Sequence, residues 1–368
     1  MILFSFIIPV YNVDKYLGVC LNSVISQTYT NWEAILINDG SEDNSAKICD
    51  KYSVMDERIK VFHRKNEGSL MARRFGMNQA QGQYFLFIDS DDIINSKLLE
   101  KANDIIQKTH SDMIVYRFQH FGKYINRNSP IVFKDGTIIG EDAINKERLW
   151  KKIISGNQLN NLCIKIVSRY IIDFDTDYQQ FAFMKSGTDL MQSMALIDNA
   201  EKIYFLNDIL YYYRYNEKGI SSTKTKITDT NCLKMHMKTR EMILDHKLYY
   251  LKKNGYDTIE NLQMFYKYNF ISKMIQITEW ISKIKKHNNK ITIIKLALTE
   301  QALDDGKKYL NPNMFSCIYR KMYKQYISGS SKLYITIFLQ ATYINLLTEI
   351  SLLYGKINNI TRKNINNQ

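Results

Sequence analysis

The 368-residue sequence contains only five cysteines and three prolines. The cysteines are odd in number and widely scattered, and no two of them have the CxxC spacing of a zinc or redox site. We therefore expect reduced, mostly buried thiols in a cytoplasmic protein. The few prolines, the 15 glycines and the lack of any low-complexity tract argue against a disordered or fibrous chain.

Two common phosphate-binding motifs are also missing. No GxGxxG follows an expected strand, which argues against a dinucleotide-binding Rossmann site. No GxxxxGK[ST] occurs, which argues against a P-loop. If the protein binds a nucleotide, it must do so with a different set of residues.

Long apolar runs that would indicate a leader or a membrane span are not evident. Residues 1–9 are apolar but have neither a basic n-region nor a small-residue cleavage site, so we expect a first β-strand. Residues 333–354 approach the length of a span but include Gln340, Asn345 and Glu349. A buried helix, or an amphipathic helix that rests on a bilayer, is expected there instead.

The sequence does have enough apolar residues for a sizeable core, at 45% hydrophobic and 12% aromatic. Its net charge of +13 arises in the C-terminal part alone. Residues 1–230 contain 28 Lys and Arg against 28 Asp and Glu, whereas residues 231–368 contain 22 against 9. A basic region of this kind implies an anionic partner, such as nucleic acid, a membrane surface or a phosphate-bearing acceptor.

The periodicity of the first 115 residues predicts alternating strands and helices. Such alternation is typical of βαβ units and a parallel sheet. Strands are expected at 4–10, 32–38, 59–63 and 84–88, and helices at 13–26, 45–52 and 70–80.

The pattern then loosens, and after residue 228 it becomes helical, Lys-rich and Ile-rich. We predict an α/β domain over 1–228, with halves 1–115 and 116–228, and a basic, mostly helical region over 229–368. The elements expected in the second half are a strand at 113–117, a hairpin over 119–140, helices at 141–156 and 189–196, and strands at 202–206 and 209–215.

One expected strand ends in a cluster of carboxylates. The apolar run Phe85–Ile88 is followed at once by Asp89, Asp91 and Asp92. Adjacent carboxylates repel one another, and a hard divalent cation such as Mg²⁺ or Mn²⁺ relieves that repulsion. The alternative is a solvated turn with an Asp that caps a following helix.

Three further strand ends carry polar or aromatic residues that suit a nucleotide. Tyr11 follows the first strand, Asp39 follows the second, and Arg73 lies on the helix after the third. The carboxyl ends of parallel strands meet at one edge of a sheet. An aromatic ring, a lone carboxylate, a guanidinium and an acidic cluster together predict a site for a nucleotide diphosphate and a metal.

With these motifs in place, the sequence resembles the family 2 glycosyltransferases of the GT-A fold, in particular bacterial enzymes of capsule, exopolysaccharide or lipooligosaccharide synthesis. The resemblance rests on Ile8–Asn12, Ile37–Ser41, Ala72-Arg73 and Ile88–Asp92, and on a block from Lys185 to Ser222. It implies a GT-A fold, a Rossmann-like and mostly parallel sheet flanked by helices, followed by the helical region.

The resemblance also implies a role for each motif residue. Pro9, Tyr11 and Asp39 would hold the base, Asn12 would belong to the same nucleotide-sugar site, and Arg73 would lie near the nucleotide or its diphosphate. Asp89-Ser90-Asp91 corresponds to the DXD motif, in which Asp89 would contact the ribose, Ser90 would belong to the nucleotide-sugar site and Asp91 would ligate Mn²⁺ or Mg²⁺. Asp92 would only cap the next element. Arg214 and Ser221 are candidates for contact with the acceptor or diphosphate, and Tyr211–Tyr213 either stack on sugars or pack in the core.

Inverting enzymes of this family use a single general base, the Asp of a Glu-Asp pair. In this sequence the block is Gly187-Thr188-Asp189, so Asp189 is the expected base and Thr188 replaces the glutamate. Asp175 and Asp177 are the alternatives. The other interpretation of Asp189 is a charge at a helix N-terminus that complements the helix dipole.

The implied activity is an inverting, metal-dependent transfer of a sugar from a nucleotide-diphospho-sugar, UDP-linked, to a saccharide acceptor that is lipid-linked. The basic region would then associate with the anionic inner face of the cell membrane, and the apolar C-terminal helices are candidates for homodimer contacts. Nucleic acid is not an expected partner. The alternatives are a nucleotidyltransferase of sugar activation and a non-catalytic protein that binds an anionic ligand or nucleic acid.

Overall fold

The computed structural model divides into two compact units, residues 1–224 and 225–368. The residues that it describes are 1–122, 127–140, 143–156, 159–182, 184, 187–216, 230–283, 290, 293–295, 297–299, 301–330, 332–333, 336–337 and 340. The predicted domain boundary at 228/229 lies outside the described residues.

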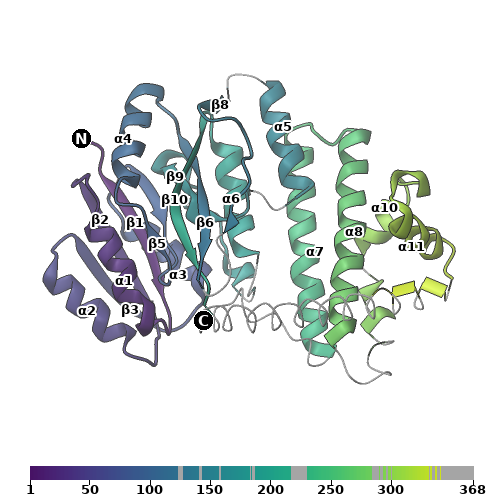
Figure 1. Cartoon of the computed structure of the whole chain (residues 1–368), viewed down its shortest axis with the longest axis horizontal. Coiled ribbons are helices and arrows are strands. Elements are labelled where there is room, and N and C mark those ends of the chain that lie inside the picture. The colour runs from purple at the N-terminus through teal and green to yellow at the C-terminus, as the bar shows by residue number, and fades with distance from the viewer. Residues whose placement is uncertain are drawn as a thin grey trace, which may run out of the picture. The chain divides into compact units, whose positions relative to one another are not determined.

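The first half of unit 1 alternates strands and helices as the sequence predicts (Figure 1). Its elements are β1 (Phe4–Val10), α1 (Asp14–Ile25), β2 (Trp32–Asp39), α2 (Ser45–Met55), β3 (Ile59–Arg64), α3 (Ser69–Gln79), β4 (Tyr84–Phe87), β5 (Ile93–Ile94) and α4 (Leu98–Thr109). Strand β1 pairs in parallel with β2 and β4, and β2 pairs in parallel with β3. Every residue of β2 is buried, as expected for a strand of a parallel sheet covered on both faces.

The second half of unit 1 extends the same sheet with strands of both directions. Its elements are β6 (Met113–Phe121), β7 (Arg127–Asn128), β8 (Thr137–Ile139), α5 (Ala143–Ile154), β9 (Lys165–Ser168), α6 (Thr188–Asn199) and β10 (Ile203–Arg214), with short 3₁₀ turns η1 (Leu162–Ile164), η2 (Arg169–Ile171) and η3 (Gln179–Phe181). The strand order is β3-β2-β1-β4-β9-β6-β10-β5, with β7 beside β6 and β8 beside β10. The sheet is therefore mixed, because β9 runs antiparallel to both β4 and β6.

The structure corrects three expectations about this half. The central strand β9 has no counterpart in the sequence prediction. The strands expected at 202–206 and 209–215 form one strand, β10, whose pairing with β6 shifts register between Phe205 and Tyr211. In the expected hairpin over 119–140, β7 does pair with β6, but β8 pairs with β10 instead.

Unit 2 is helical, as the sequence predicts. Its elements are α7 (Thr230–Lys253), α8 (Ile259–Lys283), α10 (Gln301–Gly306), the 3₁₀ turn η4 (Pro312–Met314) and α11 (Cys317–Ile327). Helices α7 and α8 lie side by side, since Arg240 donates to the backbone carbonyl of Asn269 at 3.0 Å (Figure 1). An aromatic-rich core that includes Phe270, Phe315 and Tyr323 joins α8 to α11.

No helix within the described ranges is both long enough and apolar enough to cross a membrane. The apolar segment 333–354 lies mostly outside those ranges. Of the five cysteines, Cys20, Cys49 and Cys163 are buried, Cys232 is partly buried and Cys317 is exposed.

Candidate active site

The loops after β1 and β2 form one polar wall at the carboxyl edge of the sheet. Asn12 has a left-handed backbone, with φ of 50°, and its side-chain oxygen accepts a hydrogen bond from Glu42 N at 2.8 Å. In return, Asn12 N donates to the hydroxyl of Ser41 at 3.1 Å. The ring of Tyr11 is 47% exposed on this wall, whereas Pro9 is partly buried. An exposed aromatic held beside a rigid turn is suited to stacking on a nucleotide base.

Asp39 organises the neighbouring loop between β3 and α3. Its carboxylate is buried and accepts hydrogen bonds from the backbone N–H groups of Glu67 and Gly68, each at 2.9 Å. Gly40 allows this close approach, because it has φ of 74° and a Cβ there would lie 3.0 Å from Asn66 N. Asp39 therefore lies where the sequence predicts, and each of its oxygens retains a lone pair for a base donor.

The acidic cluster after β4 is divided among different partners. Asp92 is buried, and its carboxylate accepts hydrogen bonds from the Tyr211 hydroxyl at 2.6 Å and from Arg214 N at 2.7 Å. Burial, with the charges of Asp89 and Asp91 adding to it, raises the pKa of Asp92 well above its usual range. The prediction that Asp92 only caps the next element is wrong, since strand β5 follows it and its oxygens anchor β10. Tyr211 is fully buried and belongs to the core rather than to a sugar-stacking surface.

Arg73 connects the acidic cluster to α6. Its Nη2 donates to Asp89 Oδ1 at 2.6 Å and its Nη1 donates to Asp189 Oδ1 at 2.9 Å. The Arg73 side chain is only 6% exposed, whereas those of Asp89 and Asp189 are 30% and 31% exposed. Burial raises the pKa of Asp89, and the guanidinium of Arg73 opposes that effect. The buried guanidinium of Arg73 thus joins Asp89, which is expected to face the donor, to Asp189, which is expected to act as the base.

Replacing Arg73 with Met is expected to lower the free energy of unfolding by about 3 kcal/mol, because two partly buried carboxylates lose their shared counter-charge. Urea unfolding at pH 7.5 measures this change. The matched control is Arg74→Met on the same helix, where the lost contacts are a hydrogen bond to the Asp173 carbonyl at 2.6 Å and a cation–π contact with Tyr178. That control should cost about 1 kcal/mol. Equal losses in the two variants would contradict the importance of the Arg73 ion pairs.

Asp189 is the second residue of α6, which begins directly after a left-handed Gly187 with φ of 83°. Its second oxygen, Oδ2, accepts a long hydrogen bond from Leu162 N at 3.4 Å. Thr188, which replaces the family's usual glutamate, is buried. The alternatives Asp175 and Asp177 are exposed on the turn after Asp173 and lie on the Arg74 side. The structure therefore groups Asp189, and not the alternatives, with Arg73 and Asp89.

The end of β10 closes the other side of Asp91. Arg214 Nε donates to the Asp91 backbone carbonyl at 2.8 Å, and its guanidinium lies 4.8 Å from the Phe121 ring centroid. Asn216 Nδ2 donates to Asp91 Oδ2 at 2.9 Å. Sequence reasoning missed Asn216, which belongs to no motif. Ser90 is buried beside the cluster, and Ser221 lies outside the described residues.

The hydrogen-bond and ion-pair partners of Asp89, Asp91 and Asp92 determine which of these carboxylates has oxygens left to bind a divalent cation. Within the described ranges, no three His, Cys, Asp or Glu side chains are arranged to hold a metal ion by themselves. Asp89 pairs with Arg73, and the two oxygens of Asp92 accept from Tyr211 and Arg214. Asp91 accepts from Asn216 through Oδ2 and has lone pairs left for a metal, and a single carboxylate fits Mg²⁺ or Mn²⁺ when a bound diphosphate and water complete the ligands.

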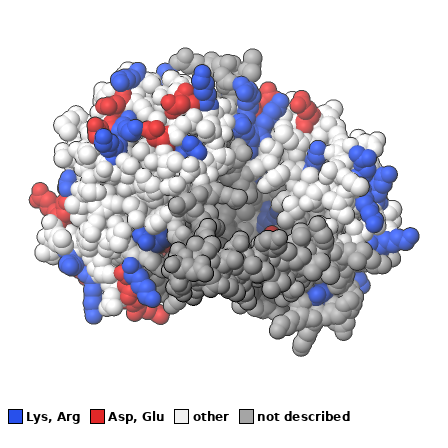
Figure 2. Space-filling view, viewed as in Figure 1, with Lys and Arg blue, Asp and Glu red and all other residues white. Residues whose placement is uncertain are grey.

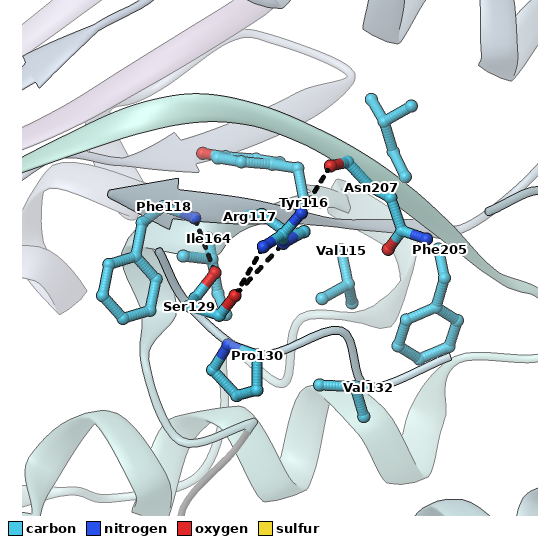
Figure 3. A pocket seen from close by; sticks show the side chains of 11 residues that line it. Val115, Tyr116, Arg117, Phe118, Ser129, Pro130, Val132, Ile164, Phe205 and Asn207 are labelled. Atoms are coloured by element: carbon cyan, nitrogen blue, oxygen red, sulfur yellow. Dashed lines mark hydrogen bonds between the residues drawn. The ribbon is translucent and has the colours of Figure 1, made fainter. Parts of the chain in front are cut away.

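A small apolar pocket lies elsewhere in unit 1 (Figure 3). It is bounded by β6, β10 and the segment 129–132, and its lining contains none of the predicted site residues. Arg117 beside it donates to the backbone carbonyls of Ser129 at 2.8 Å and Asn207 at 3.3 Å. These contacts hold the irregular part of β10, so we assign the pocket to packing.

Known proteins with similar sequences are bacterial glycosyltransferases. The family model for glycosyl transferase family 2 matches residues 5–175. Glycosyltransferase GlyG of Streptococcus pneumoniae serotype 4 is 30% identical over 234 residues, which cover 60% of this chain and 74% of GlyG. Glycosyltransferase GlyA of the same organism is 31% identical over 229 residues, covering 60% of this chain but 32% of GlyA.

A similar fold is found in the crystal structure of Staphylococcus aureus TarS 1–349 in complex with UDP-GlcNAc. It aligns with a TM-score of 0.64 at 21% identity and covers 91% of this chain and 90% of that chain. The mixed sheet with strand-end motifs is therefore a GT-A fold, and the proteins of similar sequence are glycosyltransferases. The chain belongs to glycosyl transferase family 2.

The family assignment confirms that the protein is a glycosyltransferase enzyme. It therefore replaces the two alternatives that the sequence left open, the nucleotidyltransferase and the non-catalytic binding protein.

Proposed function

We propose that the chain is an inverting, metal-dependent hexosyltransferase that transfers a sugar from a UDP-sugar to a lipid-linked saccharide in cell-surface polysaccharide synthesis. The observation that carries this proposal is the Arg73 bridge, which places Asp189 and Asp89 on one guanidinium at 2.9 and 2.6 Å. A base and a donor-facing carboxylate held this close suit a direct displacement between two bound substrates.

In the proposed reaction, Asp189 accepts the proton of an acceptor hydroxyl as that oxygen attacks the anomeric carbon of the donor sugar. The new glycosidic bond forms opposite the breaking bond to the diphosphate oxygen, so the anomeric configuration inverts. The electron pair of the breaking bond leaves with UDP. Asp91 would hold the Mg²⁺ or Mn²⁺, and the bound ion would neutralise charge on the departing diphosphate.

The base-binding wall supports the choice of a pyrimidine nucleotide donor. Tyr11 offers an exposed ring, and the buried Asp39 carboxylate is placed to accept an N–H from the base. The TarS structure that shares the fold contains UDP-GlcNAc. These points favour UDP-GlcNAc as the first donor to test.

Donor binding is tested by thermal shift with UDP-GlcNAc and Mn²⁺. At a concentration of about 100 Kd, the ligand should stabilise the fold by about 2.7 kcal/mol, since it binds only the native state. Tyr11→Ala should reduce the shift, whereas Tyr170→Ala, an exposed tyrosine distant in sequence, should not. No shift with UDP-, GDP- or dTDP-sugars would overturn the proposed function.

An anionic membrane surface is the partner proposed for unit 2. Exposed basic side chains gather directly after α10 and on α11: Lys307, Lys308, Arg320, Lys321 and Lys324 (Figure 2). Each is worth about 1 kcal/mol near an anionic bilayer. Ile327, the last residue of α11, is 44% exposed. This surface suits an enzyme whose acceptor is anchored at the membrane.

Liposome co-sedimentation of the full chain tests this partner. Changing Lys308, Arg320, Lys321 and Lys324 together to Gln should release the protein from vesicles that contain anionic lipid. The matched control changes four exposed lysines of unit 1, Lys47, Lys51, Lys97 and Lys108, to Gln and should leave binding unchanged. Equal binding of both variants to anionic and neutral vesicles would contradict the proposal.

A further inference from the structure

A lysine is completely buried next to the candidate base. Lys165 opens the central strand β9 and has no solvent-exposed surface. Its ammonium donates hydrogen bonds to the backbone carbonyls of Leu159, at 2.7 Å, and Asn161. Within the described ranges, no Asp or Glu lies at ion-pair distance from this ammonium. Burying a charge without a paired carboxylate costs free energy of folding, and in Lys165 the two backbone carbonyls are the groups that offset this cost.

Those contacts fix the short segment 159–162 against the start of α6. The carbonyl of Asn160, which lies between the two carbonyls held by Lys165, accepts a hydrogen bond from the Ser193 hydroxyl at 2.8 Å. At the end of the segment, the N–H of Leu162 donates to Asp189 Oδ2. The segment is therefore held by the Lys165 ammonium on one side and by α6 on the other.

We infer that Lys165 is a positioning residue for the general base, because it holds segment 159–162 where Leu162 N–H orients the Asp189 carboxylate. The inference rests on the proposed function, in which Asp189 is the base. Arg73 holds one oxygen of that carboxylate and Leu162 holds the other, so rotation of the carboxylate is restricted from both sides. A carboxylate that rotates less spends more time in the orientation in which Asp189 can accept the proton of the acceptor hydroxyl.

The protonation of Lys165 gives this arrangement a measurable signature. Burial lowers the pKa of Lys165 to about 7, while the nearby Cys163 and Asp189 act in the opposite direction. The unfolded chain keeps a lysine pKa near 10.5 and so holds more protons than the folded chain between about pH 7 and 10.5. Lys165 should therefore make the protein more stable as the pH rises through this window. In Lys165→Met that contribution is missing.

The experiment compares Lys165→Met with the wild type in the full chain by hydrogen exchange and by turnover of UDP-GlcNAc. Met keeps the length of the side chain but cannot hold the two carbonyls. We expect exchange in 159–163 to rise at least tenfold, and kcat to fall at least tenfold while KM for UDP-GlcNAc changes less than twofold. Lys101→Met, which breaks an ion pair with Asp208 in which both side chains are 43% exposed, is the control and should change neither quantity.

Wild-type exchange and wild-type kcat in Lys165→Met would overturn the inference. If that variant does not fold, Ser193→Ala tests the inference, because it removes only the hydrogen bond from α6 to the Asn160 carbonyl. Faster exchange in 159–163 together with a lower kcat supports the inference, and no change in either quantity overturns it. If the wild type turns over no UDP-sugar, the proposed function fails. The exchange data then still show whether Lys165 holds segment 159–162 in place, and wild-type exchange in Lys165→Met would overturn that part of the inference independently of the proposed function.

Discussion

Asp189→Asn is expected to abolish sugar transfer while donor binding persists. A general base contributes about 10³-fold to the rate of such a reaction, so kcat should fall by about that factor. Asn is isosteric with Asp, and its side-chain oxygen still accepts a hydrogen bond from Arg73 Nη1. The fold and the donor site should therefore survive. Transfer assays give kcat, and thermal shift with UDP-GlcNAc reports donor binding in the same preparation.

Asp175→Asn is the matched control, because Asp175 is the alternative base and is exposed on the turn after Asp173. Transfer should be unchanged in this variant. If instead Asp189→Asn retains transfer and Asp175→Asn loses it, the assignment of the base is wrong. Loss of donor binding in Asp189→Asn would indicate that the Arg73 bridge is needed for the donor site as well.

Asp91→Asn is expected to reduce turnover by about 10²-fold or more, since it removes the carboxylate that remains for a metal once Asp89 and Asp92 are engaged by their partners. The amide oxygen introduced by this substitution is a weaker ligand for a hard cation, and the hydrogen bond from Asn216 can still form after an amide flip. Wild-type turnover should stop with EDTA and return with Mn²⁺, whereas the turnover of Asp91→Asn should not return.

The control for this prediction is Asp104→Asn on the exposed face of α4. It should respond to EDTA and Mn²⁺ as the wild type does. Melting curves without metal check that Asp91→Asn remains folded. Full wild-type activity in EDTA would refute the metal assignment without affecting the family assignment.

The first half of the sheet could be predicted closely because its strands are apolar runs separated by amphipathic helices. Strands β1 to β4 lie within a residue or two of their predicted positions. Strand β9 could not be predicted, because it has four residues and begins with a lysine, a residue type that is usually exposed. Strand β10 was divided into two because Asn207-Asp208 resembles a turn, whereas in the structure it lies within an irregular, continuous strand.

For the site, the strand-end motifs predicted which residues gather but not how they pair. The bridge from Arg73 to Asp189 spans 116 positions, and the bond from Tyr211 to Asp92 spans 119. No local sequence pattern predicts contacts between residues so far apart in the chain, since these contacts depend on β9 lying beside β4 and on β10 lying beside β6. The proposed role of the buried Lys165 could not be predicted for the same reason, because it depends on contacts that form only when β9 lies in the sheet.

The burial of Asp92 has a consequence for the order in which the protein folds. Its two partners, Tyr211 and Arg214, are among the last residues of unit 1 to leave the ribosome. Until they emerge, the buried carboxylate lacks its donors, and the edge after β4 cannot pack stably. The family match ends at residue 175, so a nascent chain of that length contains neither of these two partners. Closure of the catalytic edge during synthesis must therefore await β10.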